Sequence, residues 1–257
     1  WWGYEWMFDF EEDVVIDPEE PTYFYSKAGL ALDIPTRFLT WQASVDQEYY
    51  LNEDGEGDPD TWYMTTSGRF GTSIPLGFEL PGFTEVHYSP AAISSVSYKP
   101  GTGISEDRAG VELGGAHGIS TGRIDWKGNF RSGAELSFTQ DARWNFKKEQ
   151  WYSDFEAELQ VHETLGFMGI SSRLNGFYKY QGEKNDAGDE IRGILDRRID
   201  GNGAIFGNFD FPVKMWIWFL DRWFEGHLSP FFDFAVVHPA DSGGEWERPW
   251  YGAGLEA

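Results

Sequence analysis

Apolar and polar side chains alternate at every second position along most of this chain. In residues 154–162 (DFEAELQVH) the apolar positions run from Phe155 to Val161, and residues 133–144 (GAELSFTQDARW) repeat the pattern. A period of two places the two sets on opposite faces of a β-strand, whereas an amphipathic helix needs a period near 3.6. Because helical periodicity is nearly absent, the sequence predicts an all-β fold.

The alternating segments predict about twelve antiparallel strands with connections of two kinds. We expect the strands at residues 1–10, 23–34, 38–51, 61–75, 82–98, 108–125, 130–146, 152–163, 167–181, 203–213, 226–238 and 249–257. Long polar connections alternate with short ones, except that 147–151 is short and 214–225 is long where the order requires the opposite. Long external loops and short periplasmic turns are typical of an outer-membrane β-barrel.

The aromatic content supports a transmembrane β-barrel. The chain has 13 Trp, 12 Tyr and 21 Phe, and many of the Trp and Tyr residues lie near the predicted strand ends, where aromatic girdles meet the two membrane interfaces. The alternative is a soluble Trp-rich carbohydrate-binding β-sandwich, but sandwich strands usually have only about five or six residues. We therefore expect residues 1–257 to form a single barrel domain in the bacterial outer membrane, with outer-membrane lipid and lipopolysaccharide as partners.

Charge and cysteine content exclude several other classes. The formal net charge is −23, which argues against nucleic acid as a partner, because a phosphate-backbone binder needs a basic face. There are no cysteines, so a disulfide framework and a thiolate metal site are both excluded. The longest near-apolar stretch, residues 211–220, is too short to cross a membrane as a helix.

The 182–202 connection carries the densest basic cluster of this acidic chain. Its 21 residues include Arg192, Arg197 and Arg198, and its glycines permit sharp bends. Alternation in the two strands that follow directs Asp210 and Asp233 to the inward face, where each carboxylate can accept a bidentate bond from a guanidinium. We predict that the loop folds inward and that Arg192 reaches Asp233, or failing that Asp210. The alternative is that Arg192 is one exposed loop charge among several.

Four sequence segments carry a resemblance to a known family. They are DEIRGI (189–194), GNGAIFGNFDFPV (201–213), GHLSPFFDFAVV (226–237) and WYGAGLEA (250–257). They resemble the C-terminal part of the bacterial surface antigen outer-membrane β-barrel superfamily, which includes the insertase BamA and the two-partner-secretion transporters. The family hallmark is an Arg-Gly pair on a loop that folds into the lumen. The resemblance covers about 70 residues, and residues 1–180 are similar in style only.

The resemblance implies a binding set of Arg192, Gly193, Asp210, Phe231 and Asp233. The sequence departs from the family pattern at two places. Ile194 replaces the usual aromatic residue, and Ala235 replaces the last Gly of the Phe-x-Asp-x-Gly pattern. The family barrel has sixteen strands, with five after the Arg-Gly loop. Here we expect three, either in a shortened barrel or in one that lacks its last strands. The 257 residues contain no segment of the POTRA type that precedes known family barrels.

The function expected from these features is non-enzymatic. We expect an integral outer-membrane barrel that resembles those for protein insertion or secretion, with its lumen plugged by the infolded Arg-Gly loop. A small outer-membrane pore or a lipase-type outer-membrane enzyme is the alternative, and the soluble binding module is the third. The apolar turn at residues 214–224 is interpreted as an interfacial anchor, with a docking surface for another envelope protein as the alternative.

Motifs for catalysis, metal binding and cofactor binding give no match. The acidic loop NEDGEGDPD (52–60) starts like a calcium loop, but its twelfth position is Tyr63 rather than the required bidentate Glu. The five histidines lack metal-ligand spacing, and no nucleophile elbow or phosphate-binding loop occurs. We therefore predict no catalytic residue, no metal and no cofactor.

Overall fold

The computed structural model shows an antiparallel β protein. It describes residues 5–15, 23–52, 62–99, 103–104, 110–128, 130–181, 185–186, 191–192, 200–215, 226–239 and 246–256. The longer strands among these residues are β1 (Glu5–Val15), β2 (Tyr23–Pro35), β3 (Thr40–Asn52), β4 (Trp62–Glu79), β6 (Ala91–Lys99), β8 (Val111–Lys127), β9 (Phe130–Asn145), β10 (Gln150–Leu165), β11 (Met168–Tyr180), β14 (Gly203–Asp210), β16 (Gly226–His238) and β17 (Trp250–Glu256). The shorter ones are β5 (Glu85–Tyr88), β7 (Gly103–Ile104), β12 (Asn185–Asp186), β13 (Asp200–Gly201) and β15 (Val213–Met215). The described residues contain no helix long and apolar enough to cross a membrane.

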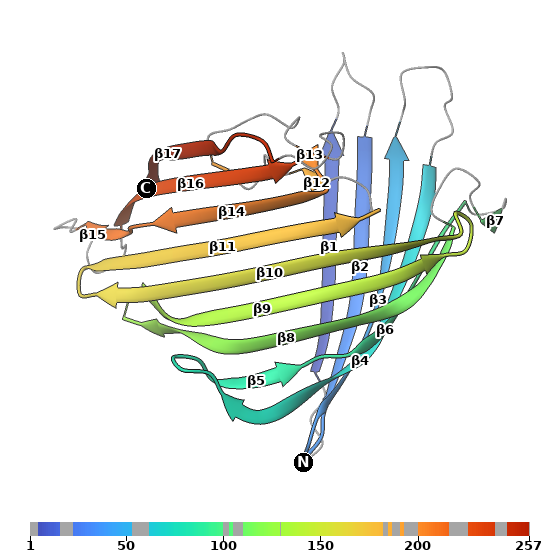
Figure 1. The fold of residues 1–257 in the computed structure, drawn as a ribbon, viewed down its shortest axis with the longest axis horizontal. Coiled ribbons are helices and arrows are strands. Elements are labelled where there is room, and N and C mark those ends of the chain that lie inside the picture. The colour runs from blue at the N-terminus through green and yellow to red at the C-terminus, as the bar shows by residue number, and fades with distance from the viewer. Residues whose placement is uncertain are drawn as a thin grey trace. The chain divides into compact units, whose positions relative to one another are not determined.

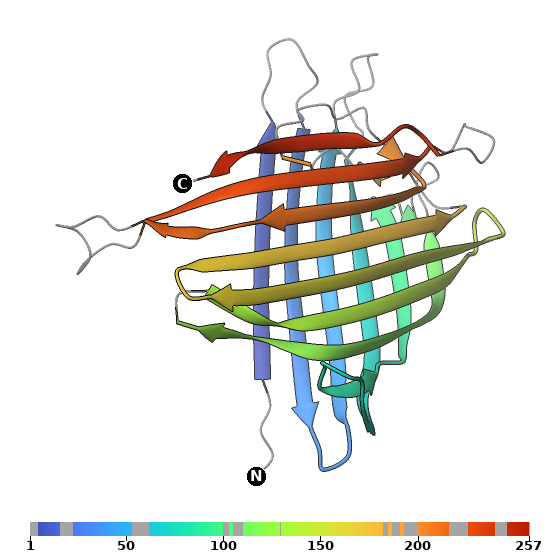
Figure 2. The same cartoon turned by 60° about the vertical axis from the view of Figure 1, so that its left-hand side comes forward.

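Two compact units share the chain. The first comprises residues 1–75, 88–117 and 141–152, and the second comprises 76–87, 118–140 and 153–257. In the first unit β1, β2, β3, β4, β6 and β8 pair in that order. In the second unit β8, β9, β10, β11, β14, β16 and β17 pair in order, and Figures 1 and 2 show β9 to β17 side by side. The closure of the strands into one barrel domain stays a prediction.

The strand number differs from twelve for local reasons. Two expected strands are each divided, and three two-residue strands lie in the loops of the described chain. The expected strand 82–98 is β5 and β6, separated by Pro90, which has no N–H to donate to a ladder. The expected strand 203–213 likewise ends at Asp210 before Pro212, after which β15 begins. Of the 214–224 turn, 214 and 215 belong to β15, and 216–224 lie outside the described residues.

In the first unit, a buried polar cluster explains the unusually short 146–149 turn. Asn145 is fully buried and donates from Nδ2 to Glu112 Oε1 at 2.9 Å. Its Oδ1 accepts the backbone N–H groups of Lys147 and Lys148 at 3.0 and 2.8 Å. The side chain therefore satisfies donors that a tight turn would otherwise leave unpaired.

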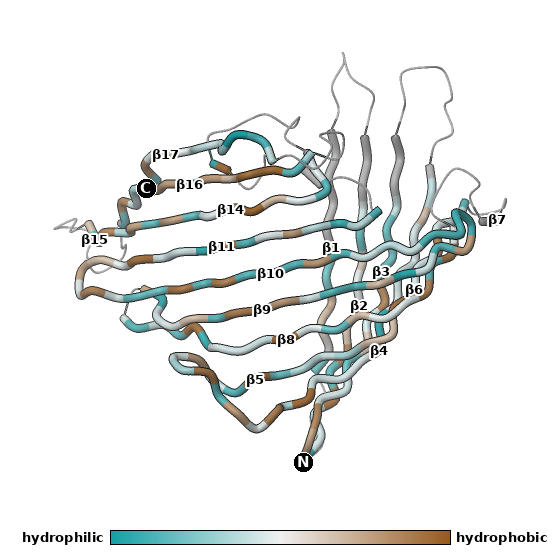
Figure 3. Tube along the Cα trace, in the orientation of Figure 1, coloured by the Kyte–Doolittle hydropathy of each residue, from teal (hydrophilic) through white to brown (hydrophobic). Residues whose placement is uncertain are grey.

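In the second unit, the two faces of the strands differ as alternation predicts. Figure 3 shows hydropathy alternating along these strands. Leu136, Phe138, Val161, Phe211 and Phe232 are exposed on one face. The other face of β14 and β16 carries the apolar cluster of Ala204, Phe206, Ala235 and Val237, which Ile191 joins from the 182–202 connection. The core of this unit therefore lies on the face to which the sequence assigned Asp210 and Asp233.

Candidate functional site

In the second unit, Arg192 contacts three carboxylates on the face of β14 and β16 that carries Asp210 and Asp233. Its Nε and Nη2 donate to Asp233 Oδ2 and Oδ1 at 2.9 and 2.7 Å, and its Nη1 donates to Asp210 Oδ1 at 2.6 Å. The backbone N–H of Arg192 also donates to Asp233 Oδ2 at 3.0 Å. Nη1 lies 3.3 Å from Glu256 Oε1. The arginine therefore binds three carboxylates, one of them through a bidentate fork.

Strand register places these carboxylates on one face. Asp233 on β16 lies opposite Asn208 on β14 and opposite Gly252 on β17. Two residues along, Phe231 lies opposite Asp210 on β14 and Gly254 on β17. Because side chains two apart share a face, Asp210, Phe231 and Asp233 project to the same side of the sheet. The Arg192 guanidinium lies over the Phe231 ring, 4.0 Å from its centre, which adds a cation–π contact.

Burial makes the Arg192–Asp233 pair the central contact of the site. The Asp233 side chain is 0% exposed and that of Arg192 is 28% exposed. An isolated buried carboxylate is strongly disfavoured, so the three hydrogen bonds from Arg192, with a further one from the Asn208 side chain, allow Asp233 to be charged there. In return, the hydrogen bond to Asp233 raises the pKa of Arg192 above its ordinary value. Arg192 therefore stays a cation beside the buried Asp233 carboxylate.

Ile191 extends the site into the apolar core. Its side chain is 1% exposed and packs with Phe206, Ala235 and Val237. Full burial of such a side chain contributes on the order of 1.5–3 kcal/mol. Ile191 thus makes apolar contacts with the sheet, and its neighbour Arg192 makes ionic ones.

The structure brings together four of the five residues in the expected binding set. Arg192 contacts Asp210, Phe231 and Asp233 as described above, while Gly193 lies outside the described residues, as do Arg197 and Arg198. Sequence reasoning missed Ile191, Gly252 and Glu256. Alternation in β17 could have indicated the last two, because residues 252, 254 and 256 share the inward face and only Glu256 of these has a side chain.

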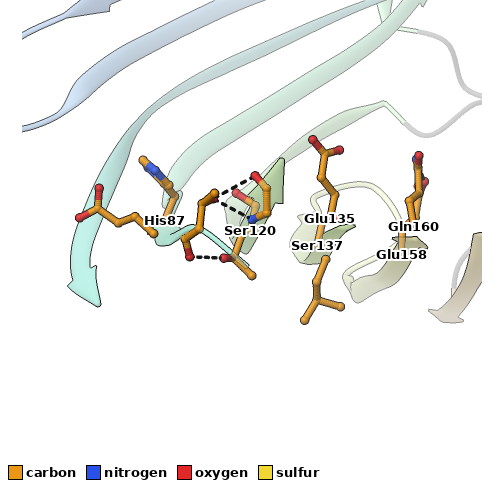
Figure 4. A pocket seen from close by; sticks show the side chains of 11 residues that line it. His87, Ser120, Glu135, Ser137, Glu158 and Gln160 are labelled. Atoms are coloured by element: carbon orange, nitrogen blue, oxygen red, sulfur yellow. Dashed lines mark hydrogen bonds between the residues drawn. The ribbon is translucent and has the colours of Figure 1, made fainter. Parts of the chain in front are cut away.

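A second polar surface continues across β9, β10 and β11. Glu158 accepts from Arg173 Nε and Nη2 at 3.0 and 3.3 Å, and His162 Nδ1 lies 2.7 Å from Ser171 Oγ. A cavity of about 410 Å³ adjoins this surface, and Figure 4 shows Glu135, Glu158 and Gln160 pointing to the same side of it.

The neighbours of His162 on this second surface are a serine and an amide. His162 Nε2 lies 3.4 Å from the Gln160 amide oxygen, so its neighbour there is an amide and not the carboxylate of a catalytic triad. In the described part of the chain, no three His, Asp or Glu residues are grouped so that they could hold a metal ion. His162 and Ser171 lie directly opposite each other on the neighbouring strands β10 and β11.

Comparison with known proteins supports the fold. The structure is similar to CdiB from Acinetobacter baumannii, with a TM-score of 0.56 and 12% sequence identity. The similarity covers 91% of this chain and 44% of that chain, so this chain spans less than half the length of CdiB. No family model matches the sequence, and no curated protein matches it. The likeness therefore shows an all-β antiparallel fold of the CdiB kind.

Proposed function

We propose that this chain is a non-enzymatic outer-membrane β-barrel of the protein secretion or insertion type, closed by its own 182–202 loop. Three features support the proposal. The fold resembles that of CdiB, a secretion transporter barrel. Large apolar side chains such as Phe138 and Phe232 are exposed on one face of the strands, as contact with lipid requires. The opposite face holds a polar ion cluster, as a lumen would.

The observation that carries the proposal is the bond between Arg192 and Asp233. The two residues are 41 positions apart in sequence and meet on the inward face of the sheet. A loop attached only at its two ends would remain in solvent, because ordering it costs conformational entropy. The ion cluster and the burial of Ile191 offset that cost for Ile191 and Arg192, and we propose that these two residues hold the loop across the face that a conduit would need. For the 214–224 turn we keep the proposal of an interfacial anchor, with a contact to another envelope protein as the alternative.

Single-channel conductance in planar bilayers tests the closure. Arg192→Ala removes the contacts of the arginine side chain with the three carboxylates and should therefore release the loop. Conductance should then rise several-fold over that of the unaltered protein. The matched control is Arg123→Ala. Arg123 pairs with Asp125 at 2.8 Å, but both side chains are more than half exposed, so its loss should leave conductance unchanged.

Proteolysis of the same variants supplies the second readout. Proteinase K should cut the 182–202 loop faster in Arg192→Ala than in Arg123→Ala, because the released loop is accessible. Unchanged conductance together with rapid loop cleavage would show that the loop is released without opening a conduit, and the proposal of a closed conduit would be abandoned.

A further inference from the structure

A cavity of about 410 Å³ lies on the face of β9 and β10 that carries Glu135 and Glu158. All of its lining residues belong to the second unit. They include the carboxylates of Glu85, Glu135 and Glu158, and no Lys or Arg is among the described residues that line it. Pockets that bind small ligands have volumes of about 300–1,000 Å³, so this cavity is large enough for a small organic molecule.

Two glycines distort the β8–β9 pair beside this cavity. Gly122 has a φ of 112° and Gly133 has a φ of 132°, values that residues with a Cβ rarely adopt. A Cβ at Gly122 would overlap the Ala134 carbonyl oxygen, and a Cβ at Gly133 would overlap that of Arg123. The two backbones therefore approach more closely here than other residues would allow. Local distortions of a ladder of this kind are frequent beside functional sites.

The Thr84 side chain binds the backbone of β8 at this distortion. Its Oγ1 accepts the Gly122 N–H at 3.1 Å and donates to the Gly122 carbonyl oxygen at 3.0 Å. Thr121 Oγ1 donates to the Thr84 carbonyl oxygen at 2.8 Å, and Figure 4 shows these bonds beside the cavity. A side chain thus takes the place of a strand partner for the Gly122 backbone, and it holds this wall of the cavity in position.

Glu135 contributes a carboxylate that the described part of the chain does not neutralise. Within the described residues no hydrogen bond or ion pair involves Glu135, and its charge acts on His162 only at longer range. Glu158, by contrast, accepts from Arg173 Nε and Nη2 at 3.0 and 3.3 Å. Figure 4 shows the Glu135 and Glu158 side chains on the same side of the cavity. The cavity therefore presents a negative charge with acceptor oxygens to whatever enters it.

We propose that the cavity binds an organic cation with N–H donors, an ammonium or guanidinium group on an alkyl chain, with Glu135 as its counter-ion. Ser137, two residues along β9 on the same face, and Gln160 line the cavity and offer further acceptor oxygens. A metal ion fits less well, because no three His, Asp or Glu among the described residues are grouped closely enough to hold one. The site goes beyond the proposed function and does not depend on it, because residues of the second unit alone form it.

Titration with agmatine, which carries both cationic groups, tests the site on the full chain in zwitterionic detergent micelles. Saturation-transfer NMR should show saturable binding. Glu135→Gln should weaken it by about tenfold, because the amide keeps the shape of the side chain but removes a charge-assisted bond. The control is Glu156→Gln, which removes the same charge from the Glu158 face of β10 but outside the cavity, and should leave the affinity unchanged. Equal losses in the two variants would mean diffuse attraction by the acidic surface and overturn the site, as would the absence of saturable binding.

Thr84 variants test the wall of the cavity independently of its charge. Thr84→Val removes both side-chain bonds to Gly122 at similar volume, so agmatine binding should weaken several-fold. Thr84→Ser keeps the hydroxyl and should retain the affinity. Unchanged affinity in Thr84→Val would overturn the positioning role of Thr84. A polypeptide side chain and a free amine present the same cationic group. Tighter binding of acetyl-Gly-Arg-Gly-amide than of agmatine would assign the site to a peptide side chain, and the reverse order would assign it to a free amine.

Discussion

At the scale of the residue, Asp233 determines how much the loss of the Arg192 side chain would lower the free energy of unfolding. Its carboxylate is fully buried and receives three hydrogen bonds from Arg192. Arg192→Ala removes two of the three and leaves a buried charge without its counter-ion. Breaking one side of a buried ion pair costs about 3–5 kcal/mol, so we expect that loss in the free energy of unfolding, measured by urea titration of tryptophan fluorescence in micelles.

Two comparisons isolate the buried charge as the cause. Arg123→Ala should cost less than about 1 kcal/mol, because exposed ion pairs contribute little. Adding Asp233→Asn to Arg192→Ala should recover part of the loss, since a neutral amide is less costly to bury than a carboxylate. Equal destabilisation by Arg192→Ala and Arg123→Ala would contradict this explanation.

At the scale of the element, the two faces of each strand should respond differently to charge. Phe232 on β16 is exposed beside the buried Asp233, and Leu136 and Phe138 on β9 are exposed on either side of Ser137. If the exposed face contacts lipid, Phe232→Arg should cost about 2–4 kcal/mol near the bilayer midplane. Ser137→Arg, on the opposite face, should cost much less in the same urea titration in lipid vesicles. Equal costs would exclude this orientation of the strands.

At the scale of the whole molecule, the exposed apolar residues determine the solvent that the chain needs. Met7, Phe8, Phe38 and Phe70 of the first unit are each more than half exposed, as are several large apolar residues of the second. Large apolar side chains exposed in this number are costly in water and suit lipid. The chain, expressed with a signal peptide in a Gram-negative host, should therefore sediment with outer-membrane vesicles in a sucrose gradient. Recovery as a monodisperse protein without detergent would favour the Trp-rich soluble module instead.

The sequence alone predicted an antiparallel all-β fold and the faces of the strands around the candidate site, but not every strand boundary. Alternation is a local property, because successive Cβ atoms of any strand point to opposite sides, and it placed Asp210 and Asp233 on one face before their neighbours were known. Phe231 was expected at the site only from the family resemblance. The pairing of Arg192 with these carboxylates followed from that face and from the resemblance of its loop to an infolded one. The division of two strands near Pro90 and Pro212 could also have been predicted, because proline has no N–H to donate to a ladder. The alternating pattern continues through both prolines and therefore favoured single long strands.

Only the tertiary structure decided what the loop rests on. The roles of Ile191, Gly252 and Glu256 depend on which strands lie beside β16 and in which register, and pairing between distant segments leaves no local pattern. Gly252 is the clearest case. In sequence it is one of many glycines, and its importance comes from the Arg192 carbonyl 2.3 Å from where its Cβ would be. Close packing between segments 60 residues apart is a property of the folded chain, because each surface acquires its shape only when the other is in place.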